Sequence, residues 1–196
     1  CLGPCDISVS EMVSAYTAFP MKGVRRSPLL VTHIEDSDGN IVAQFAPRVR
    51  EVISEEAAYK MIVLMQGVMN GGTGSRMRNR YKIMADMGGK TGTTNDNSDG
   101  WFIGYTPTLS FGAWVGGDER DIHFASMALG QGANSALPIV ANFLNKVYAD
   151  NTLGYSPEDK FDIPPGFDPC ANVYGEGEEG EILEGVEQVG LDEMAN

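Results

Sequence analysis

The residue types best suited to chemistry in this 196-residue chain lie at positions 90–94, which read Lys-Thr-Gly-Thr-Thr. The stretch places one ammonium group, one glycine and three hydroxyl groups close together. β-Branched threonines favour an extended backbone, and Gly92 leaves room for a ligand or a second backbone to approach. In a strand, the side chains of Thr91 and Thr93 lie on the same face.

A phosphate-binding P-loop is the first alternative, because it also joins a glycine to a Lys-Thr pair. That motif needs a second glycine, as G-x-x-x-x-G-K-[ST], and it lies between a strand and a helix. Gly89-Lys90-Thr91 supplies the end of the motif, but Met84 stands where the first glycine is required. A polar loop and another apolar run follow where the helix should begin. The sequence therefore excludes a P-loop.

Three short strands are predicted around residues 90–94. The first contains the stretch itself, and the polar loop 95–100 connects it to the apolar run 101–105. A second apolar run at 109–115 follows a Thr-Pro-Thr turn. Short apolar runs bounded by turn residues are typical of neighbouring strands joined by tight connections.

The longer run resembles a known enzyme family. Lys-Thr-Gly alone occurs by chance in many chains, but KTGTT followed by DGWFIGYTP and FGAWVGGD resembles the transpeptidase domain of bifunctional (class A) penicillin-binding proteins. The resemblance implies an α+β fold of the penicillin-binding and β-lactamase-like type, with an antiparallel sheet flanked by helices. The chain would hold part of such a domain.

The resemblance also implies roles for individual residues in acyl transfer through a serine ester. Lys90 and Thr93 would be catalytic, and the backbone N–H of Thr93 would contribute to the oxyanion hole. Thr91, Gly92 and Thr94 would bind substrate. The implied ligands are the peptidoglycan stem peptide and β-lactams, with no metal and no organic cofactor.

Other residues near the motif are expected to be structural. Asp99 and Trp101 match the family's pattern after the motif, the first in the loop and the second in the core or the cleft wall. The Gly-Thr-Gly run at 72–74 also matches the family, although a glycine helix stop explains it equally well. We expect the basic cluster Arg76, Arg78, Arg80 and Lys82 to form a solvated loop face; attraction of an anionic peptidoglycan strand is the alternative.

The nucleophile that this chemistry requires is absent from the sequence. The family places it in Ser-x-x-Lys, followed by Ser-x-Asn, and neither pattern occurs here. We therefore expect residues 1–150 to be the C-terminal half of a transpeptidase domain, inactive alone. The N-terminal half, a glycosyltransferase domain and a membrane anchor would lie upstream. The parent protein would act in the cell envelope, at the extracytoplasmic face of the membrane.

Two other functions fit the same residues. A non-catalytic binding or sensor module could keep this fold without the nucleophile, and a serine β-lactamase carries the same Lys-Thr-Gly motif. The intact Lys-Thr-Gly-Thr favours retained substrate binding over the first. The long flanking pattern and the acidic extension favour a transpeptidase over the second.

Charge and composition divide the chain in two. The net charge is −13, of which residues 151–196 carry −11 and residues 1–150 carry −2. Neither part has the basic surface that nucleic-acid binding needs, so we exclude that partner. The proline, glycine and glutamate content of 151–196 predicts an extended or disordered extension, in which Ile182, Val186 and Val189 could dock a short segment.

The three cysteines, Cys1, Cys5 and Cys170, show no metal-ligand spacing. Their pattern leaves both a disulfide and free thiols open.

Helices are predicted at 11–19, 55–70 and 136–149, capped by Ser10, Ser54 and Ser135. A β-hairpin is predicted from 29–35 and 40–46, with His33 as a structural or surface residue. The apolar positions expected to face the core are Met12, Val13, Tyr16 and Phe19 in the first helix, Ala58, Met61, Ile62, Met65 and Met69 in the second, and Ile139, Phe143, Leu144 and Val147 in the third.

Overall fold

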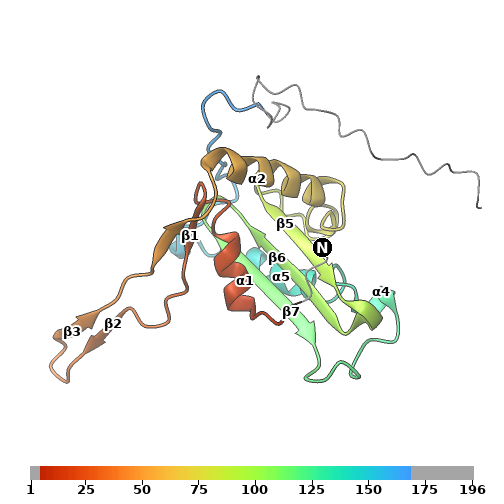
Figure 1. The fold of residues 1–196 in the computed structure, drawn as a ribbon, viewed down its shortest axis with the longest axis horizontal. Helices are drawn as coiled ribbons and strands as arrows, with labels where there is room; N and C mark the ends of the chain where they lie inside the picture. The colour runs from red at the N-terminus through yellow and green to blue at the C-terminus, as the bar shows by residue number, and fades with distance from the viewer. Residues whose placement is uncertain (1–4, 169–196) are drawn as a thin grey trace, which may run out of the picture.

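The computed structural model describes residues 5–168, and Figure 1 shows the path of the chain. Helices, two short two-stranded ribbons and one three-stranded antiparallel sheet follow one another along it. In chain order the elements are α1 Val9–Tyr16, β1 Val24–Arg26, β2 His33–Glu35, β3 Ile41–Gln44, β4 Val49–Glu51, α2 Glu55–Asn70, α3 Arg76–Asn79, β5 Gly88–Thr93, η1 Asn95–Asn97, β6 Asp99–Tyr105, β7 Ser110–Gly116, α4 Met127–Gly130, α5 Ala136–Ala149 and η2 Asn151–Leu153.

Strands β5, β6 and β7 form the sheet that carries the Lys-Thr-Gly-Thr-Thr stretch. The strand order is β5-β6-β7 and both pairs are antiparallel, with Lys90 opposite Ile103 and Trp101 opposite Trp114. The three predicted strands are therefore confirmed. The chain passes from β5 through the short 3₁₀ segment η1 into β6, so no helix follows the motif as a P-loop would require. Within residues 5–168, β5 is an edge strand.

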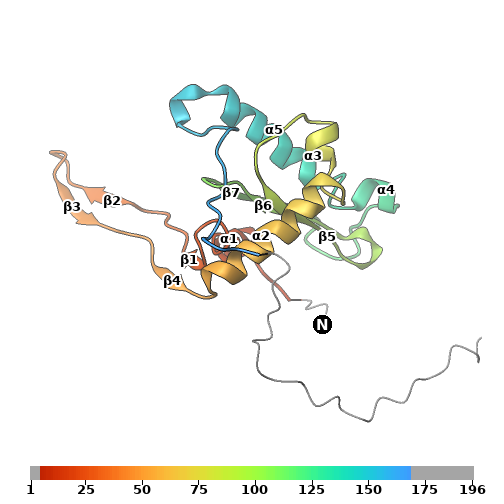
Figure 2. The ribbon, with the colours of Figure 1, turned by 90° about the horizontal axis from the view of Figure 1, so that it is seen from above.

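Helices cover both faces of this sheet (Figures 1 and 2). On one face, Val13 of α1 lies against Gly112 of β7. On the other face, Leu137 of α5 belongs to the same buried cluster as Phe102 of β6. Helix α2 packs along β5, and its fully buried Met69 joins that cluster. The sheet is thus covered on both faces, and α2 packs beside the start of β5, where Met69 lies against Gly89.

The buried face of α5 differs from the predicted one. Ile139 and Phe143 are 52% and 46% exposed, whereas Leu144 and Val147 are buried as expected. Successive helical residues are about 100° apart, so positions 139 and 143 lie about 140° and about 100° around the helix from Leu144, off the face that meets the sheet. The residues that face the sheet are Ala136, Leu137, Val140, Ala141, Leu144 and Val147.

Of the three predicted caps, Ser10 is wrong, and Ser135 occupies the N-cap position of α5 without a side-chain cap bond. Helix α1 is capped by Ser8, whose hydroxyl accepts from the N–H of Glu11, while the Glu11 carboxylate accepts from the Ser8 N–H. This reciprocal pair is a capping box, which places Ser10 inside the first turn. Ser135 makes no cap bond, because its hydroxyl donates back to the carbonyls of Gly130 and Gln131. Ser54 caps α2 as predicted.

An arm projects from the body between α1 and α2 (Figures 1 and 2). Its outer part is the predicted hairpin, formed by β2 and β3, although the strands are shorter than predicted. His33 is exposed and hydrogen-bonds Glu35 through Nε2 at 2.9 Å, so it is a surface residue. The inner part is the β1–β4 ribbon, which pairs Arg25 with Arg50 and was not predicted.

The predicted solvated basic loop is wrong for two of its four members. Arg78 is half-buried, and its Nη1 donates to the carbonyls of Ile83 (2.8 Å) and Ala85 (2.6 Å). Arg76, also half-buried, donates through Nη1 to the carbonyl of Ala133 at 3.3 Å. Both side chains satisfy main-chain carbonyls, so they stabilise the connection between α2 and β5. Arg80 and Lys82 are exposed.

Residues 155–168 return to the body of the molecule. Phe161 is buried and its ring packs against Tyr105, with centroids 5.9 Å apart. The Phe167 ring meets Tyr59 of α2 edge-on at 4.6 Å. Burial of the Tyr105 hydroxyl raises its pKa far above the ordinary value. Cys1, Cys170 and the apolar positions 182, 186 and 189 lie outside the described residues, and Cys5 is an exposed free thiol.

Candidate functional site

Within residues 5–168, the outer edge of β5 carries main-chain groups that no other strand pairs with. The N–H of Thr94 donates to the carbonyl of Asp99 at 3.1 Å, which fixes the alternation of the antiparallel ladder. Lys90 and Gly92 therefore direct their main-chain groups toward β6, and Thr91 and Thr93 direct theirs to the open edge. An extended chain could pair with the N–H and C=O groups at this edge.

Lys90 lies at the same edge. Its side chain is exposed, and its Nζ donates to the carbonyl of Thr91 at 2.7 Å. An ammonium group has three donors, so this bond leaves two for a ligand. Lys90 is opposite Ile103, which faces α1, whereas Thr91 is opposite Phe102, which faces α5. The lysine and the threonine hydroxyls thus approach the edge from its two sides.

Residues from other elements hold the hydroxyls of Thr91 and Thr93. The Oγ1 atoms of Thr91 and Thr73 are 2.7 Å apart and share a hydrogen bond. The Oγ1 of Thr93 accepts from the N–H of Gly132, in the loop between α4 and α5, at 3.1 Å. Both side chains face the same side of β5, as the strand alternation predicts.

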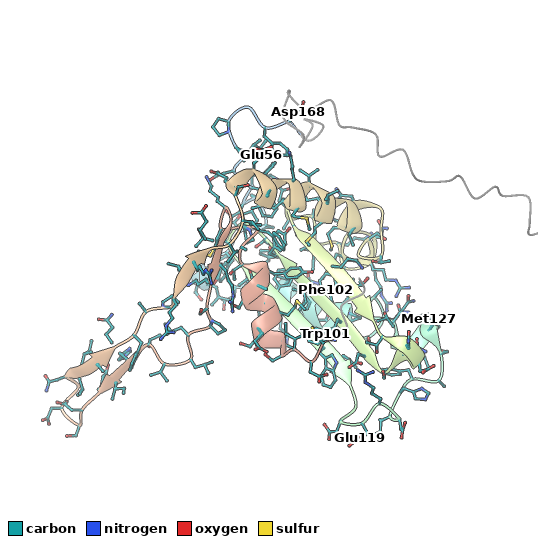
Figure 3. The ribbon with its side chains drawn as sticks, in the orientation of Figure 1. Glu56, Trp101, Phe102, Glu119, Met127 and Asp168 are labelled. Atoms are coloured by element: carbon teal, nitrogen blue, oxygen red, sulfur yellow. The ribbon has the colours of Figure 1, made fainter. Side chains whose placement is uncertain are left out.

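Gly92 lies at the centre of the edge. A Cβ atom there would meet the Cβ of Trp101 at 3.1 Å, closer than most such contacts, on the face that also carries Lys90. Trp101 and Phe102 are neighbours on β6, as Figure 3 labels them, and their side chains lie on opposite faces of the sheet. The Trp101 ring lies 6.5 Å from that of Trp114 between centroids, so the two tryptophans pack together on this face across β6 and β7.

Thr94 is not brought to the edge with the other motif residues. Its Oγ1 donates to the Asp99 carboxylate at 2.8 Å and accepts from the Asp99 N–H at 3.0 Å. Asp99 also accepts from Nε1 of Trp114 at 2.8 Å. These bonds close the turn between β5 and β6, in agreement with the structural role expected for Asp99.

The environment of Asp99 lowers the pKa of its carboxyl group. Partial burial acts to raise that pKa, but hydrogen bonds from Trp114, Thr94 and Ser98, together with the charge of Arg120, outweigh it. Asp99 is therefore held as a carboxylate across the neutral range.

Sequence reasoning missed Gly132 and Arg76 as neighbours of the motif and did not connect Thr73 with Thr91. The Gly-Thr-Gly run around Thr73 was a visible signal, but the sequence did not indicate which hydroxyl of β5 it would meet. Among residues 5–168, no group of His, Cys, Asp and Glu side chains could hold a metal ion. No helix within that range is both long enough and apolar enough to span a membrane.

Comparison with known proteins identifies the fold and the family. A family model described as the penicillin binding protein transpeptidase domain matches residues 2–148. The chain belongs to this transpeptidase family. Penicillin-binding protein 1A of Aquifex aeolicus (strain VF5) is 30% identical over 164 residues, which cover 84% of this chain and 21% of that protein. The chain thus spans about a fifth of the length of this curated relative.

Solved structures of penicillin-binding proteins share the fold. Penicillin-binding protein 1A from Haemophilus influenzae has a TM-score of 0.70 at 23% identity, over 81% of this chain and 28% of that one. The PonA1 protein from Mycobacterium tuberculosis, in complex with penicillin V, has a TM-score of 0.57 at 24% identity, over 80% of this chain and 41% of that one. The predicted α+β fold with an antiparallel sheet flanked by helices is confirmed, as is the predicted family.

Proposed function

We propose that this chain is part of a peptidoglycan-synthesising D,D-transpeptidase that cross-links stem peptides and is acylated by β-lactams. The observation that carries the proposal is the outer edge of β5, where main-chain groups that no strand within residues 5–168 pairs with lie beside the Lys90 ammonium and two threonine hydroxyls. Membership of the transpeptidase family and the penicillin V complex of a structural relative support it.

The edge suits a peptide that ends in a carboxylate. The peptide would add to the sheet beside β5, with its main chain paired to Thr91 and Thr93. Its terminal carboxylate would accept hydrogen bonds from Lys90 Nζ and from the two threonine hydroxyls. Gly92 has no side chain, so it leaves room for the peptide where the peptide lies beside β5. A β-lactam carries a carboxylate beside its reactive amide and would occupy the same edge.

The N–H of Thr93 suits stabilisation of an oxyanion. A serine supplied by the rest of the domain would attack the carbonyl between two D-alanines, forming an ester and breaking the amide bond. The terminal D-alanine leaves with a proton, and an amine of a second strand then attacks the ester and restores the serine. The carbonyl oxygen carries negative charge in both tetrahedral intermediates, and one main-chain donor contributes about 3 kcal/mol to such a transition state.

The sequence of this chain contains no Ser-x-x-Lys, so we propose that the chain is inactive by itself and works together with the other half of its domain. The parent protein would act on the extracytoplasmic side of the cell envelope, where its substrate is assembled. An edge that retains Lys90 and both threonines favours this function over a non-catalytic binding or sensor module of the same fold.

Replacement of Lys90 tests the proposal. In the full-length protein, Lys90→Ala should lower the second-order rate constant for acylation by benzylpenicillin roughly tenfold to a hundredfold, because the ligand carboxylate loses a charged donor. Stopped-flow kinetics with a fluorescent penicillin gives this constant. Lys146→Ala removes an exposed lysine of α5 and is the matched control. An unchanged rate in a folded Lys90→Ala protein would contradict the assigned role.

A further inference from the structure

The segment that follows α2 touches the motif strand at one point and the α4–α5 loop at another. It reads Gly71-Gly72-Thr73-Gly74-Ser75-Arg76. A Cβ at Gly72 would lie 2.9 Å from the Cα of Val68, and the N–H of Gly74 donates to the Val68 carbonyl at 3.1 Å. The turn is therefore folded tightly onto the end of α2, which fixes the place of Thr73.

Thr73 is bonded directly to a hydroxyl of the proposed binding edge. Its Oγ1 is 2.7 Å from Oγ1 of Thr91, and both side chains lie near the surface. A hydroxyl has one proton to donate and two lone pairs to accept with. When Thr91 donates its proton to a carboxylate, the remaining bond must run from Thr73 to Thr91. Donation by Thr73 polarises the Thr91 hydroxyl and strengthens its bond to an anion.

Arg76 is linked through a loop to the second hydroxyl of the edge, that of Thr93. Its Nη1 donates to the carbonyl of Ala133 at 3.3 Å, and the neighbouring residue, Gly132, donates its N–H to Oγ1 of Thr93 at 3.1 Å. Met77 is fully buried and anchors the short helix that carries Arg76. Because the Gly132 N–H occupies a lone pair of Thr93, the proton of that hydroxyl remains available to a ligand.

We propose that Thr73 and Arg76 are positioning residues for the carboxylate of the ligand. Thr73 orients the Thr91 hydroxyl directly, and Arg76 orients the Thr93 hydroxyl through Ala133 and Gly132. The inference rests on the proposed function of the β5 edge and assigns a support to each of its two hydroxyls. One six-residue segment thus couples the end of α2 to both hydroxyls.

The test compares two probes that differ only in the carboxylate. Benzylpenicillin carries it, and benzylpenicillin methyl ester does not. In the full-length protein, Thr73→Val removes the hydroxyl at nearly constant volume and should lower the acylation rate constant for benzylpenicillin about fivefold, the effect of one lost hydrogen bond. The constant for the ester should stay unchanged. Thr73→Ser keeps a hydroxyl and should retain most of the wild-type rate.

Further variants separate positioning from folding. The pair Thr73→Val and Thr91→Val should be non-additive, because both changes remove the same carboxylate contact. Arg76→Gln should lower the ratio of the two rate constants about threefold, the effect of a weakened hydrogen bond. Arg80→Gln, an exposed change at the end of α3, should not alter that ratio.

The outcomes distinguish this inference from the proposed function. If the wild-type protein reacts but Thr73→Val slows both probes equally, or slows neither, the positioning role is overturned and the proposed function stands. A wild-type protein that neither probe acylates overturns the proposed function, and this inference with it. If Thr73→Val lowers the acylation rate constant for benzylpenicillin but not for its methyl ester, both the positioning role and the proposed function are supported.

Discussion

Asp99 shows how much of the local structure depends on one carboxylate. It receives hydrogen bonds from Thr94 and Trp114, and so it links the end of β5 to β7 across the turn. These bonds also hold the loop between β5 and β6. The loop contains the 3₁₀ segment η1, in which Asp96 and Asn97 have positive φ angles of 57° and 60°. Aspartate and asparagine adopt such left-handed angles more readily than other non-glycine residues do, and the bonds to Asp99 hold the turn in this conformation.

Replacement of Asp99 should change stability in a pH-dependent way. The pKa of this carboxyl is lower in the folded protein than in the unfolded chain, so its stabilising effect is complete above about pH 4 and is lost as pH falls through the folded-state value. Asp99→Asn should therefore cost about 1–2 kcal/mol near neutral pH and much less in acid.

Thermal unfolding of the intact transpeptidase domain between pH 3 and pH 7 measures this difference. Asp118→Asn, an exposed change on the loop after β7, is the control. A gap between wild type and Asp99→Asn that is constant over this pH range would show that the carboxylate is not the source of the effect.

Among the elements, the α4–α5 loop is the one most closely fitted to the sheet. At Gly132 an added Cβ would collide with the main-chain carbonyl oxygens of Trp101 and Gly92. Neither oxygen can move without disturbing the pairing of β5 with β6. The loop therefore reaches Thr93 only because position 132 has no side chain.

Gly132→Ala should accordingly lower the free energy of unfolding by about 1–3 kcal/mol, the usual cost of overpacking. Gly67→Ala is the matched control, since nothing lies within 4 Å of its Cβ position on the exposed side of α2. That control should be neutral or stabilising by about 0.5–1 kcal/mol, because alanine favours a helix more than glycine does. Urea denaturation of both variants provides the comparison, and equal stabilities would refute the close fit.

The same elements show what a sequence can predict. Helix α2, the three strands of the sheet and the outer hairpin follow from local periodicity and turn residues, and each was found. Contacts between distant segments do not leave such a pattern. The bond from Thr73 to Thr91 and the one from Arg76 to Ala133 depend on how α2 and α5 meet the sheet. The β1–β4 ribbon was missed for the same reason, since its strands are short and lie on either side of the hairpin.

The candidate site was also predicted only in part from the sequence. The motif named Lys90, Thr91 and Thr93 as neighbours because adjacent residues of one strand stay together whatever the fold. Thr94 was grouped with them by sequence alone, but its hydroxyl is bonded to Asp99 in the turn. To separate Thr94 from the other motif residues, one would have had to know that β5 ends at Thr93.

In the molecule as a whole, residues 155–168 complete the core at the end of the sheet opposite the motif. Phe161 covers Tyr105, whose hydroxyl is buried and donates to the sulfur of Met65. The Nζ of Lys22, at the end of the turn after α1, is 3.5 Å from Asp162 and 3.2 Å from Glu55. This part of the acidic extension therefore packs together with α1, α2 and the β6–β7 turn.

Phe161→Ala should lower the free energy of unfolding by about 3 kcal/mol, through lost burial and the cavity left beside Tyr105. Ile163→Ala, two residues away and 68% exposed, should change it little. Calorimetry of the intact domain, read together with the near-ultraviolet signal of tyrosine, would detect both effects. Similar unfolding temperatures for the two variants would mean that the segment contributes nothing to the core.

The projecting arm offers a point of attachment for a probe. Its tip is the exposed turn at residues 36–40, where Gly39 has a φ angle of 83° and no atom within 4 Å of its Cβ position. Exposed loop tips tolerate inserted residues better than other positions do. A short epitope or a single labelling cysteine placed there would lie away from the β5 edge (Figure 1). The arm could thus report the location of the protein in a living cell while the edge remains free to react.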